Sequence, residues 1–408
     1  MSTPPEHPDS ARAAEPDAAV TRTDVAVVGL GAWGSQALWR LAERGVDVVG
    51  VEQFDVGHAL GSTHGTTRLF RELCLEHPCL TPVAGRAREL WRELENVTGT
   101  ELLRLTGGVM AGPPDGRVVT GVASAADAAG HRVEQLGAVE ARDRFRVLRQ
   151  LPDHHVALLD PAAGLARPED GVRAAVAAAT AAGARVARAR VDGIDESGSG
   201  VVVRLAGGGR IEASQVVVAA GAWTSRLVDL DLRPRRVPMF WFDGRDSEDL
   251  VPGGILDLDR FPVIIRELDD GRCIWGHGAS RPGERGGFSV KLGLDDDGTD
   301  GLGFSDADPD HLDRSIDLRR DAAALADAVA TAYPDVDPTP LSGVACMYTR
   351  SADGNFHVGR VPGRDRVLVA AGDSGHGHKH APGVGELLAQ EAVGEGPFAD
   401  VGFMRVRR

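Results

Sequence analysis

The feature that most constrains this chain is a glycine-rich turn between an apolar strand and a helix near its N-terminus. Residues 24–28 (DVAVV) form a short apolar run, GLGAWG follows at 29–34, and a helical pattern then extends to about residue 44. A second apolar run, VDVVGVE, ends in the acid Glu52. A strand, a G-x-G-x-x-G turn, a helix and a second strand ending in an acid predict a Rossmann-like dinucleotide-binding unit.

Each glycine of this turn has its own expected role. Gly29 permits the tight turn, Gly31 lets the backbone approach a pyrophosphate, and Gly34 allows the helix to pack closely on the strand. The helix N-terminus then faces the phosphates, and Glu52 accepts hydrogen bonds from ribose hydroxyls. The Glu52 carboxylate disfavours a 2′-phosphate, but the unit alone does not distinguish NAD from FAD. The turn and the end of the second strand also place Ala32, Trp33 and Gln53 at the cofactor.

Composition limits the class of protein. Only two of the 45 basic residues are lysines, Lys291 and Lys379, so each lysine stands out against a strong preference for arginine. The formal net charge of −15 argues against a protein that binds a nucleic-acid backbone. The sequence contains no apolar run long enough to span a membrane.

Composition alone gives predictions for two segments and for the cysteines. The first twenty residues are rich in Pro, Ala and acidic residues, which predicts a disordered leader and not a signal peptide. The acidic stretch at 295–310 predicts a solvated loop. The four cysteines form no C-x-x-C pair, which suits a reducing cytoplasm. We therefore expect a cytoplasmic protein, either a monomer or a small homo-oligomer.

The rest of the chain divides into two kinds of pattern. Further α/β elements are expected as a helix at 168–182, strands at 184–194, 201–205 and 215–223, a strand and glycine turn at 366–377, and a helix at 382–394. The intervening pieces, about 105–157 and 233–337, contain alternating strands such as RFPVIIREL and RCIWGHG. This second pattern predicts a separate lobe built on a sheet.

Five separated segments in a fixed order carry a resemblance to a known family. They are GLGAWG (29–34), GSTHGTTRLFR (61–71), KLG (291–293), CMYT (346–349) and SGHGHKHAPGVG (374–385). Together they resemble the sarcosine oxidase and N-methyl-amino-acid oxidase branch of the D-amino-acid-oxidase-like flavoproteins. The resemblance extends from about residue 24 to the C-terminus.

The resemblance implies an α/β fold of two domains. One is a Rossmann-like FAD-binding domain of the glutathione-reductase type, and the other is an α+β substrate domain on a mainly antiparallel sheet. The expected divisions are a disordered leader at 1–22, the FAD-binding domain at 23–104, 158–232 and 338–408, and the substrate domain at 105–157 and 233–337.

The resemblance also implies a covalent cofactor. FAD would be attached through the sulfur of Cys346, in CMYT, to the flavin 8α-methyl group, whereas the other three cysteines are expected to be ordinary thiols. Further cofactor-binding positions implied by the resemblance are Ser62, Thr67, Arg68, Val191, Gly375, His376, Gly377 and Lys379.

Four residues would carry the chemistry. The resemblance assigns Arg71 and Lys379 to the substrate carboxylate, which a guanidinium matches with two parallel hydrogen bonds. It places Lys291 near the flavin N5, where a positive charge at low dielectric stabilises the negative charge that develops on oxygen. It directs the Tyr348 hydroxyl toward the substrate.

The sequence also departs from the family pattern. Trp275 stands where close relatives have a tyrosine, Asp295 replaces a histidine four residues after Lys291, and His378 lies in HGHKH in place of the usual HGFKF. The alternating histidines 376, 378 and 380 could suggest a metal site. We predict no metal there, because the glycines of this segment are needed for a close approach to the flavin. We predict that Trp275, Asp295 and His378 reshape the substrate pocket, so that plain sarcosine is not the favoured substrate.

These observations predict an FAD-dependent amine oxidase. It would oxidise the C–N bond of a secondary, N-methylated or cyclic amino acid to an imine and reduce O2 to hydrogen peroxide, with no nucleic-acid or membrane partner. Alternatives are a flavin-dependent amino-acid dehydrogenase that passes electrons to another carrier, and a biosynthetic imine-forming oxidase that acts on a tailored natural-product intermediate. An NAD-dependent dehydrogenase and a non-catalytic flavin-binding protein are more distant alternatives.

Overall fold

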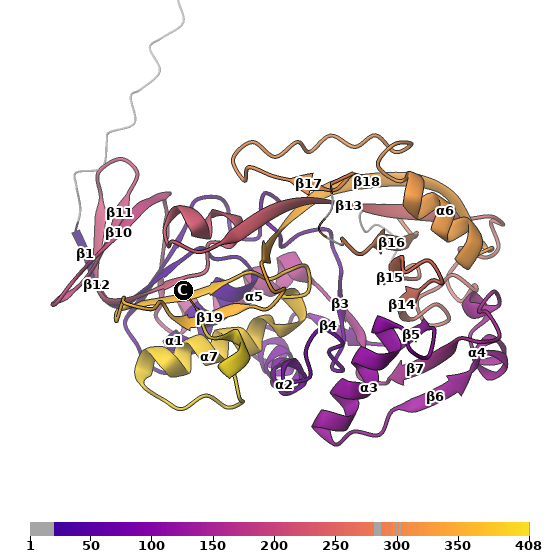
Figure 1. The fold of residues 1–408 in the computed structure, drawn as a ribbon. Coiled ribbons are helices and arrows are strands. Elements are labelled where there is room, and N and C mark those ends of the chain that lie inside the picture. The colour runs from indigo at the N-terminus through magenta and orange to yellow at the C-terminus, as the bar shows by residue number, and fades with distance from the viewer. Residues whose placement is uncertain (1–19, 281–286, 297, 299, 302, 408) are drawn as a thin grey trace, which may run out of the picture.

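The computed structural model describes residues 20–280, 287–296, 298, 300–301 and 303–407, and these residues form two large sheets and a small third one (Figure 1). The first large sheet has eight strands in the order β10-β11-β12-β1-β2-β9, with β20 beside β12 and β19 beside β20. Its strands are β1 (Val20–Val28), β2 (Val48–Glu52), β9 (Arg185–Arg188), β10 (Val191–Ser197), β11 (Gly200–Leu205), β12 (Arg210–Val218), β19 (His357–Arg360) and β20 (Val367–Ala371).

The β1–α1–β2 unit forms the centre of this sheet, as the glycine turn predicts. Strand β1 pairs in parallel with both β2 and β12. Because side chains alternate along a strand, Val25 and Val27 pack on one side, in the cluster of the helices α1 (Ala32–Glu43), α2 (Leu80–Thr98), α5 (Pro168–Ala181) and α7 (Ala381–Val393). Ala26 and Val28 pack in a second cluster on the other side. Residues 25–28 of the strand are thus buried on both faces, which explains this continuous apolar run.

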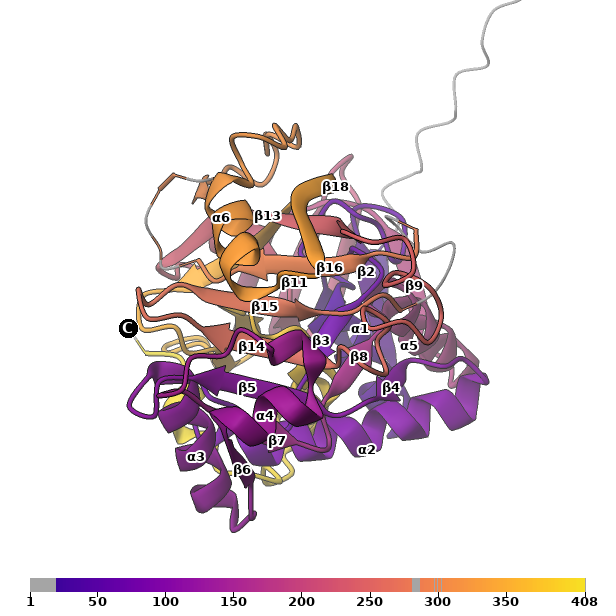
Figure 2. The ribbon, with the colours of Figure 1, turned by 90° about the vertical axis from the view of Figure 1, so that its right-hand side faces the viewer.

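The second large sheet has nine strands and is mainly antiparallel. Its order is β17-β13-β16-β15-β14-β5-β7-β6, with β18 beside β13, and the pairing of β5 with β14 is parallel. Figure 2 shows helices α3 (Arg117–Ala129), α4 (Ala138–Arg144) and α6 (Ala323–Ala332) around this sheet. Its strands are β5 (Gly108–Gly112), β6 (Glu134–Gly137), β7 (Val156–Asp160), β13 (Leu232–Gly244), β14 (Val263–Glu267), β15 (Cys273–His277), β16 (Val290–Leu294), β17 (Ser305–Asp306) and β18 (Val336–Ser351).

Two long strands join the halves of the molecule. Strands β13 and β18 pair antiparallel from Leu232 opposite Ser351 to Gly244 opposite Val336, and they run from the first half into the second (Figure 1). The small third sheet, β3 (Arg68–Phe70), β8 (Gly164–Ala166) and β4 (Leu103–Leu105), also lies between the halves. The predicted domain boundaries after residues 157 and 337 therefore fall inside strands β7 and β18. The division into two domains stays a prediction.

Three expectations about single elements differ from the structure. The segment expected as one strand at 184–194 forms two strands, β9 and β10, which lie at opposite ends of the strand order. Strand β1 begins at Val20, so residues 20–22 of the expected leader belong to the sheet, and residues 1–19 lie outside the described part of the chain. The predicted strand at 215–223 ends at Val218. The backbone of Ala219 and Ala220 then passes close to Gly29, and the chain continues as the 3-10 helix η2 (Gly221–Arg226).

The acidic stretch at 295–310 is not simply a solvated loop, and that prediction was wrong for Asp296. The Asp296 side chain is 2% exposed and pairs with Arg235, which is 1% exposed, through two hydrogen bonds of 3.0 Å. A buried guanidinium requires a counter-charge. Asp306 of the same stretch lies in β17 and also binds Arg235.

All four cysteines are free thiols. Among the helices of the described residues, none combines the length and the apolar character needed to cross a bilayer.

Candidate active site

A cavity of about 830 Å³ lies between the carboxyl ends of β1 and β2 and the second sheet. Ligand pockets usually occupy ~300–1,000 Å³, and open α/β sheets bind ligands outside the carboxyl ends of their strands. Every site residue predicted from the sequence lines this cavity except Gly34. Segments that are far apart in the chain, from residue 28 to residue 379, therefore meet at one place.

The three glycines of the turn have three different surroundings. Gly29 has φ +87°, and a Cβ there would lie 2.6 Å from the Ala219 carbonyl oxygen. A Cβ at Gly34 would lie 1.8 Å from the Gly29 carbonyl oxygen, so Gly34 allows the close contact of helix and turn. At Gly31 the nearest atom to a Cβ would be Thr63 Oγ1, at 3.8 Å. Gly31 thus leaves open space on the cavity side.

The N-terminus of α1 and Glu52 border the same end of the cavity. No side chain caps the helix at Gly31, and the Ala32 amide donates to Thr63 Oγ1 at 3.3 Å. Glu52 accepts hydrogen bonds from the amides of Leu30 (2.8 Å) and Phe54 (3.0 Å). Burial opposes ionisation, but hydrogen bonds from His58 and from these amides lower the pKa of Glu52. A carboxylate accepts hydrogen bonds from ribose hydroxyls, and backbone amides at a helix N-terminus bind phosphates.

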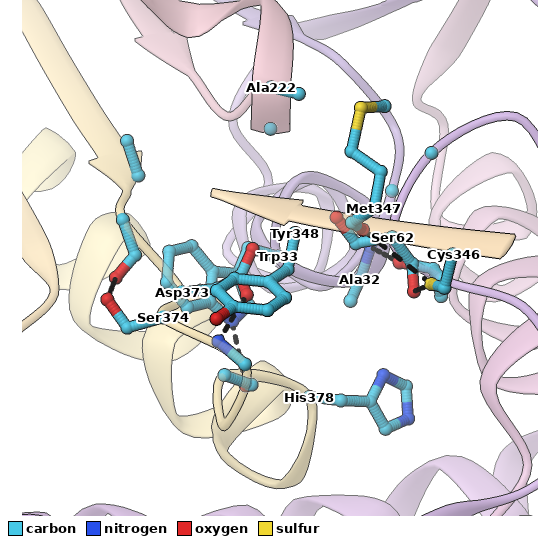
Figure 3. Close-up of a pocket in the computed structure, with 18 of the residues that line it drawn as sticks. Ala32, Trp33, Ser62, Ala222, Cys346, Met347, Tyr348, Asp373, Ser374 and His378 are labelled. Carbon is cyan, nitrogen blue, oxygen red and sulfur yellow. Dashed lines mark hydrogen bonds between the residues drawn. The ribbon is translucent and has the colours of Figure 1, made fainter. Parts of the chain in front are cut away.

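Cys346 lies in β18, opposite the loop that precedes β3. Its Sγ is 3.6 Å from the Ser62 carbonyl oxygen and 3.6 Å from Arg68 Nη2. Figure 3 shows the thiol directed at Ser62, with Tyr348 two residues further along the strand. Burial raises the pKa of Cys346, and the positive charge of Arg68 opposes that rise. The thiol therefore faces the cavity beside a cation.

Lys291 of β16 is buried against the same loop. Its side chain is 2% exposed, and its Nζ donates to the carbonyl oxygens of Gly65 and Thr67 at 2.8 Å each and to Thr67 Oγ1 at 3.2 Å. The ammonium also lies 5.4 Å from the centre of the Trp241 ring, a cation–π distance. A fixed positive charge is thereby held at the cavity wall.

His277 is a cavity residue that the sequence analysis missed. It is buried beside Lys291, and its Nε2 lies 2.9 Å from Thr67 Oγ1. Burial, and then the charge of Lys291, lower the pKa of His277 to about 3, so the ring is neutral at physiological pH. Strand alternation could have found it, because Trp275 and His277 are two residues apart on β15 and share one face.

The two residues predicted to bind the substrate carboxylate are joined by a third residue, Glu76. Arg71 Nη2 donates to Glu76 Oε1 at 2.5 Å, and Lys379 Nζ donates to the same oxygen at 3.1 Å. Arg71 and Lys379 are both buried. Burial opposes ionisation of Glu76, but the two cations hold its pKa well below the usual value. The sequence analysis missed Glu76, although two buried cations require a nearby acid.

Tyr348 donates its hydroxyl proton to a protein carboxylate. The hydroxyl lies 2.6 Å from Asp296 Oδ2, and Asp296 in turn pairs with Arg235. Burial and the Asp296 carboxylate both raise the pKa of Tyr348. Because its only proton goes to Asp296, the phenol oxygen can act only as an acceptor toward the cavity.

The three departures from the family pattern also lie at the cavity wall. Trp275 Nε1 donates to the Leu294 carbonyl oxygen at 3.0 Å, and Asp295 pairs with Arg117 at 2.7 Å. The ring nitrogens of His378 have no hydrogen-bond partner among the described residues. Burial, followed by the charges of Arg68 and Lys291, lowers the pKa of His378 to about 3. This wall therefore combines an indole, an ion pair and a neutral imidazole.

Two of the alternating histidines, His376 and His380, have separate partners. His376 Nε2 lies 3.3 Å from the Gly354 carbonyl oxygen, and His380 Nε2 lies 3.8 Å from Cys74 Sγ.

Elsewhere in the described chain, His154 and His155 converge on Asp269 Oδ1 at 2.8 Å each, outside the cavity. These contacts are hydrogen bonds that fasten the loop before β7 to the turn between β14 and β15.

Comparison with known proteins places these features in a family. Residues 24–391 match the DAO family, described as FAD dependent oxidoreductase. The chain is 34% identical over 390 residues to a monomeric sarcosine oxidase of Streptomyces avermitilis, covering 94% of this chain and 97% of that protein. It is 30% identical over 395 residues to an N-methyl-L-tryptophan oxidase of Salmonella agona, covering 94% and 98%. Among solved structures, NikD, an amino acid oxidase of nikkomycin biosynthesis, has a similar fold with a TM-score of 0.77 at 23% identity, covering 95% and 98%.

Proposed function

The chain belongs to the DAO family of FAD-dependent oxidoreductases, and we propose that it oxidises the C–N bond of a secondary, N-methylated or cyclic amino acid to an imine. The proposed electron acceptor after FAD is O2. The oxidation removes two electrons and two protons from the substrate, one proton from nitrogen and one from carbon, and O2 takes up both pairs to give hydrogen peroxide. Water hydrolyses an open imine, whereas a cyclic imine can stay closed.

The residues at the first sheet fit FAD. Gly31 leaves the space that a pyrophosphate needs and, as the N-cap residue of α1, brings no side-chain cap, and Glu52 is an ionised acceptor for ribose hydroxyls. Bound FAD would supply the acceptor for the two electrons that leave the substrate as its C–N single bond becomes a double bond. The protein's own task is to bind the amine, orient it and hold charges in place.

We propose that FAD is attached covalently to Cys346. The position of the Cys346 thiol at the cavity wall, beside Arg68, supports this proposal, because a cation favours the thiolate that reacts. Acid precipitation of the purified protein tests it. Yellow colour should remain in the pellet of the wild-type protein and move to the supernatant for Cys346→Ser. Yellow colour in the wild-type supernatant would contradict a covalent bond to Cys346.

The charges at Arg71 and Lys379 support a substrate with a carboxylate. Two buried cations share one carboxylate, Glu76, so this cluster carries an excess positive charge that a substrate anion neutralises. The guanidinium of Arg71 also donates to the Leu73 carbonyl oxygen, which fixes its plane. An amino acid bound here would donate an N–H of its amine to the phenol oxygen of Tyr348, whose own proton goes to Asp296.

We further propose a substrate larger than sarcosine. Trp275, the Asp295–Arg117 pair and His378 all line the cavity, and an amino acid with a ring or a polar side chain has groups that pack on the indole and bind the ion pair. Sarcosine has no such groups. A larger N-methylated or cyclic amino acid should therefore have the higher kcat/KM.

One observation supports the proposed function most strongly: a buried lysine and a buried cationic clamp line the same cavity as the glycine turn. A panel of amines with peroxide detection tests it, with each amino acid paired with its decarboxylated analogue. The loss of charge-assisted hydrogen bonds to the carboxylate should lower kcat/KM about 100-fold. Equal kcat/KM values for the two members of each pair would contradict the proposal that Arg71 and Lys379 bind the substrate carboxylate.

The proposed location is the cytoplasm. Four free thiols, three of them buried, suit a reducing compartment. No nucleic acid or membrane is required by this chemistry, and a small amine and O2 suffice as partners.

A further inference from the structure

A chain of hydrogen bonds leads from Lys291 through Thr67 to His277. Lys291 Nζ donates to Thr67 Oγ1 at 3.2 Å, and Thr67 Oγ1 lies 2.9 Å from His277 Nε2. On the other side of the ring, His277 Nδ1 lies 2.6 Å from the Gly278 carbonyl oxygen. All three side chains are buried and line the cavity.

The strand register brings these groups together. His277 of β15 and Lys291 of β16 are direct cross-strand partners, so their side chains stand on the same face of the sheet. Trp241 of β13 is the partner of Lys291 on its other side. The lysine is therefore flanked by an aromatic ring and an imidazole, and neither of them brings a counter-charge.

The direction of each proton follows from the acceptors. The Gly278 carbonyl oxygen has no proton to give, so Nδ1 of His277 carries the hydrogen. A neutral imidazole then has a lone pair on Nε2, and Thr67 must donate its hydroxyl proton to it. The lone pairs of Thr67 Oγ1 consequently turn toward Lys291 and accept from the ammonium.

Two further acceptors of Lys291, the carbonyl oxygens of Gly65 and Thr67, are held by a different contact. Gly65 and Thr66 both have positive φ angles, +98° and +65°, and the second value is uncommon for a residue with a side chain. The Glu169 carboxylate accepts from the amide of Gly65 at 2.7 Å and from that of Thr66 at 3.2 Å. Glu169 thus fixes the backbone whose carbonyls bind Lys291, but it leaves the Thr67 hydroxyl free to rotate. His277 supplies the missing constraint.

We propose that His277 is a positioning residue for Lys291, which it orients through the Thr67 hydroxyl so that the ammonium keeps one direction at the cavity wall. This inference rests on the proposed oxidase function, in which the Lys291 charge stabilises the negative charge that develops on oxygen. Without the imidazole, the hydroxyl can turn its proton toward Lys291, where it repels the ammonium and loosens it.

A double-mutant cycle tests the chain of contacts. His277→Leu removes the acceptor and Thr67→Val removes the hydroxyl at nearly constant volume. Each single substitution should slow reoxidation of the amine-reduced enzyme by O2 about tenfold, as expected for one lost hydrogen bond in a buried network. The double variant should be no slower than either single variant, because both break the same link. In His277→Leu, anaerobic reduction by the amine should slow less than reoxidation does, because the Lys291 charge is proposed to act on oxygen and not on the amine.

Two further variants separate positioning from packing. His277→Gln keeps an acceptor near the place of Nε2 and should restore most of the reoxidation rate. Ile274→Val, on the same strand but in the core of the second sheet, changes packing alone and should leave both rates unchanged. If His277→Gln is as slow as His277→Leu while Ile274→Val is normal, or if the effects of the two single substitutions add, the proposal fails.

A spectroscopic readout does not depend on turnover. Nitrogen NMR of histidine-labelled protein should show His277 with hydrogen on Nδ1 and a bare Nε2 through the neutral pH range, assigned by its loss in His277→Leu. In Thr67→Val the Nε2 resonance should shift, because its hydrogen bond is gone. A hydrogen on Nε2 would reverse the chain and overturn the proposal. If no amine reduces the enzyme at all, the proposed function has failed, but this NMR result still decides the proton arrangement.

Discussion

The two sides of the cavity bind in different ways. On the side of the first sheet, backbone amides, a tight glycine turn and one carboxylate form the wall around Gly31 and Glu52. On the other side, charged side chains from β16 of the second sheet and from the segment after β3 form the wall, and Lys291 and Arg71 there have defined acceptors or a counter-charge. The first side depends on shape and backbone, and the second side depends on a network of side chains.

This difference predicts which kind of substitution each side of the cavity tolerates. A backbone site responds to added volume, because a Cβ either fits or collides. A side-chain network responds to removed charge, because a neighbouring charge is then left uncompensated in a buried place. Substitutions on the two sides should therefore fail in different ways.

The largest effect is expected for Lys291→Met. Removal of the buried positive charge should slow the reaction of the reduced enzyme with O2 about 10²–10³-fold, the range found when a preorganised electrostatic contact is deleted. Reduction of the enzyme by the amine should change far less, because Lys291 does not belong to the carboxylate clamp. Stopped-flow absorbance measures the two steps separately. Unchanged reoxidation would take Lys291 out of the oxygen reaction.

Next come two alanine substitutions in the glycine turn. Gly34→Ala would place a Cβ 1.8 Å from the Gly29 carbonyl oxygen, so the free energy of unfolding should fall by about 3 kcal/mol. Gly31→Ala meets only Thr63 Oγ1 at 3.8 Å, so the protein without FAD should keep its stability while its affinity for FAD falls. Thermal unfolding and FAD titration measure the two effects. The contrast is broken if both variants are destabilised equally.

A smaller effect is expected when the clamp loses its acid. Glu76→Gln leaves Arg71 and Lys379 as neighbouring buried cations, so the free energy of unfolding without ligand should fall by about 2 kcal/mol. A carboxylate ligand should then stabilise the variant more than it stabilises the wild-type protein, because the ligand replaces the lost charge. Denaturant unfolding with and without a substrate analogue checks both statements. Arg86→Gln serves as a control, because its pair with Glu89 is solvent-exposed.

The effect that is smallest near neutral pH concerns the titration of His277. The pKa of His277 is about 3 in the folded protein and near the usual 6.5 when unfolded, so between these values the unfolded chain binds a proton that the folded protein does not. Stability should therefore fall as pH decreases from about 6.5, and His277→Leu should reduce that slope by up to about 1.4 kcal/mol per pH unit.

His311 provides the opposite control for this pH effect. Asp308 raises the pKa of His311, which gives the folded protein stability at low pH that is lost as pH rises through the folded pKa. His311→Ala should therefore make the fall in stability at acid pH slightly steeper, not shallower. Denaturant unfolding at several pH values measures both slopes, and a change of the same sign in both variants would contradict the assignment.

The sequence was sufficient for the first side of the cavity. The glycine spacing, the helix that follows it and Glu52 are contiguous, so local chain geometry determines their arrangement. Resemblance to a family supplied Lys291, Arg71, Cys346 and Lys379, all of which line the cavity. Their roles stay predictions.

The sequence was insufficient for residues that act through pairing across the fold. Glu76 is important because Lys379, far along the chain, lies beside it, and Asp296 because β13 carries Arg235. Neither contact has a local pattern, and an acidic run is ordinarily solvated. His277 was missed because the face of β15 was considered only at Trp275.

The most direct test of the proposed function is an anaerobic titration of the yellow wild-type protein with a large N-methylated or cyclic amino acid, followed by air. The visible flavin absorbance should bleach on addition of the amino acid and return in air, with one hydrogen peroxide formed for each amine oxidised. An enzyme that bleaches but stays bleached in air until an electron carrier is added would be a dehydrogenase, and the oxidase function with Lys291 at its oxygen site would be contradicted.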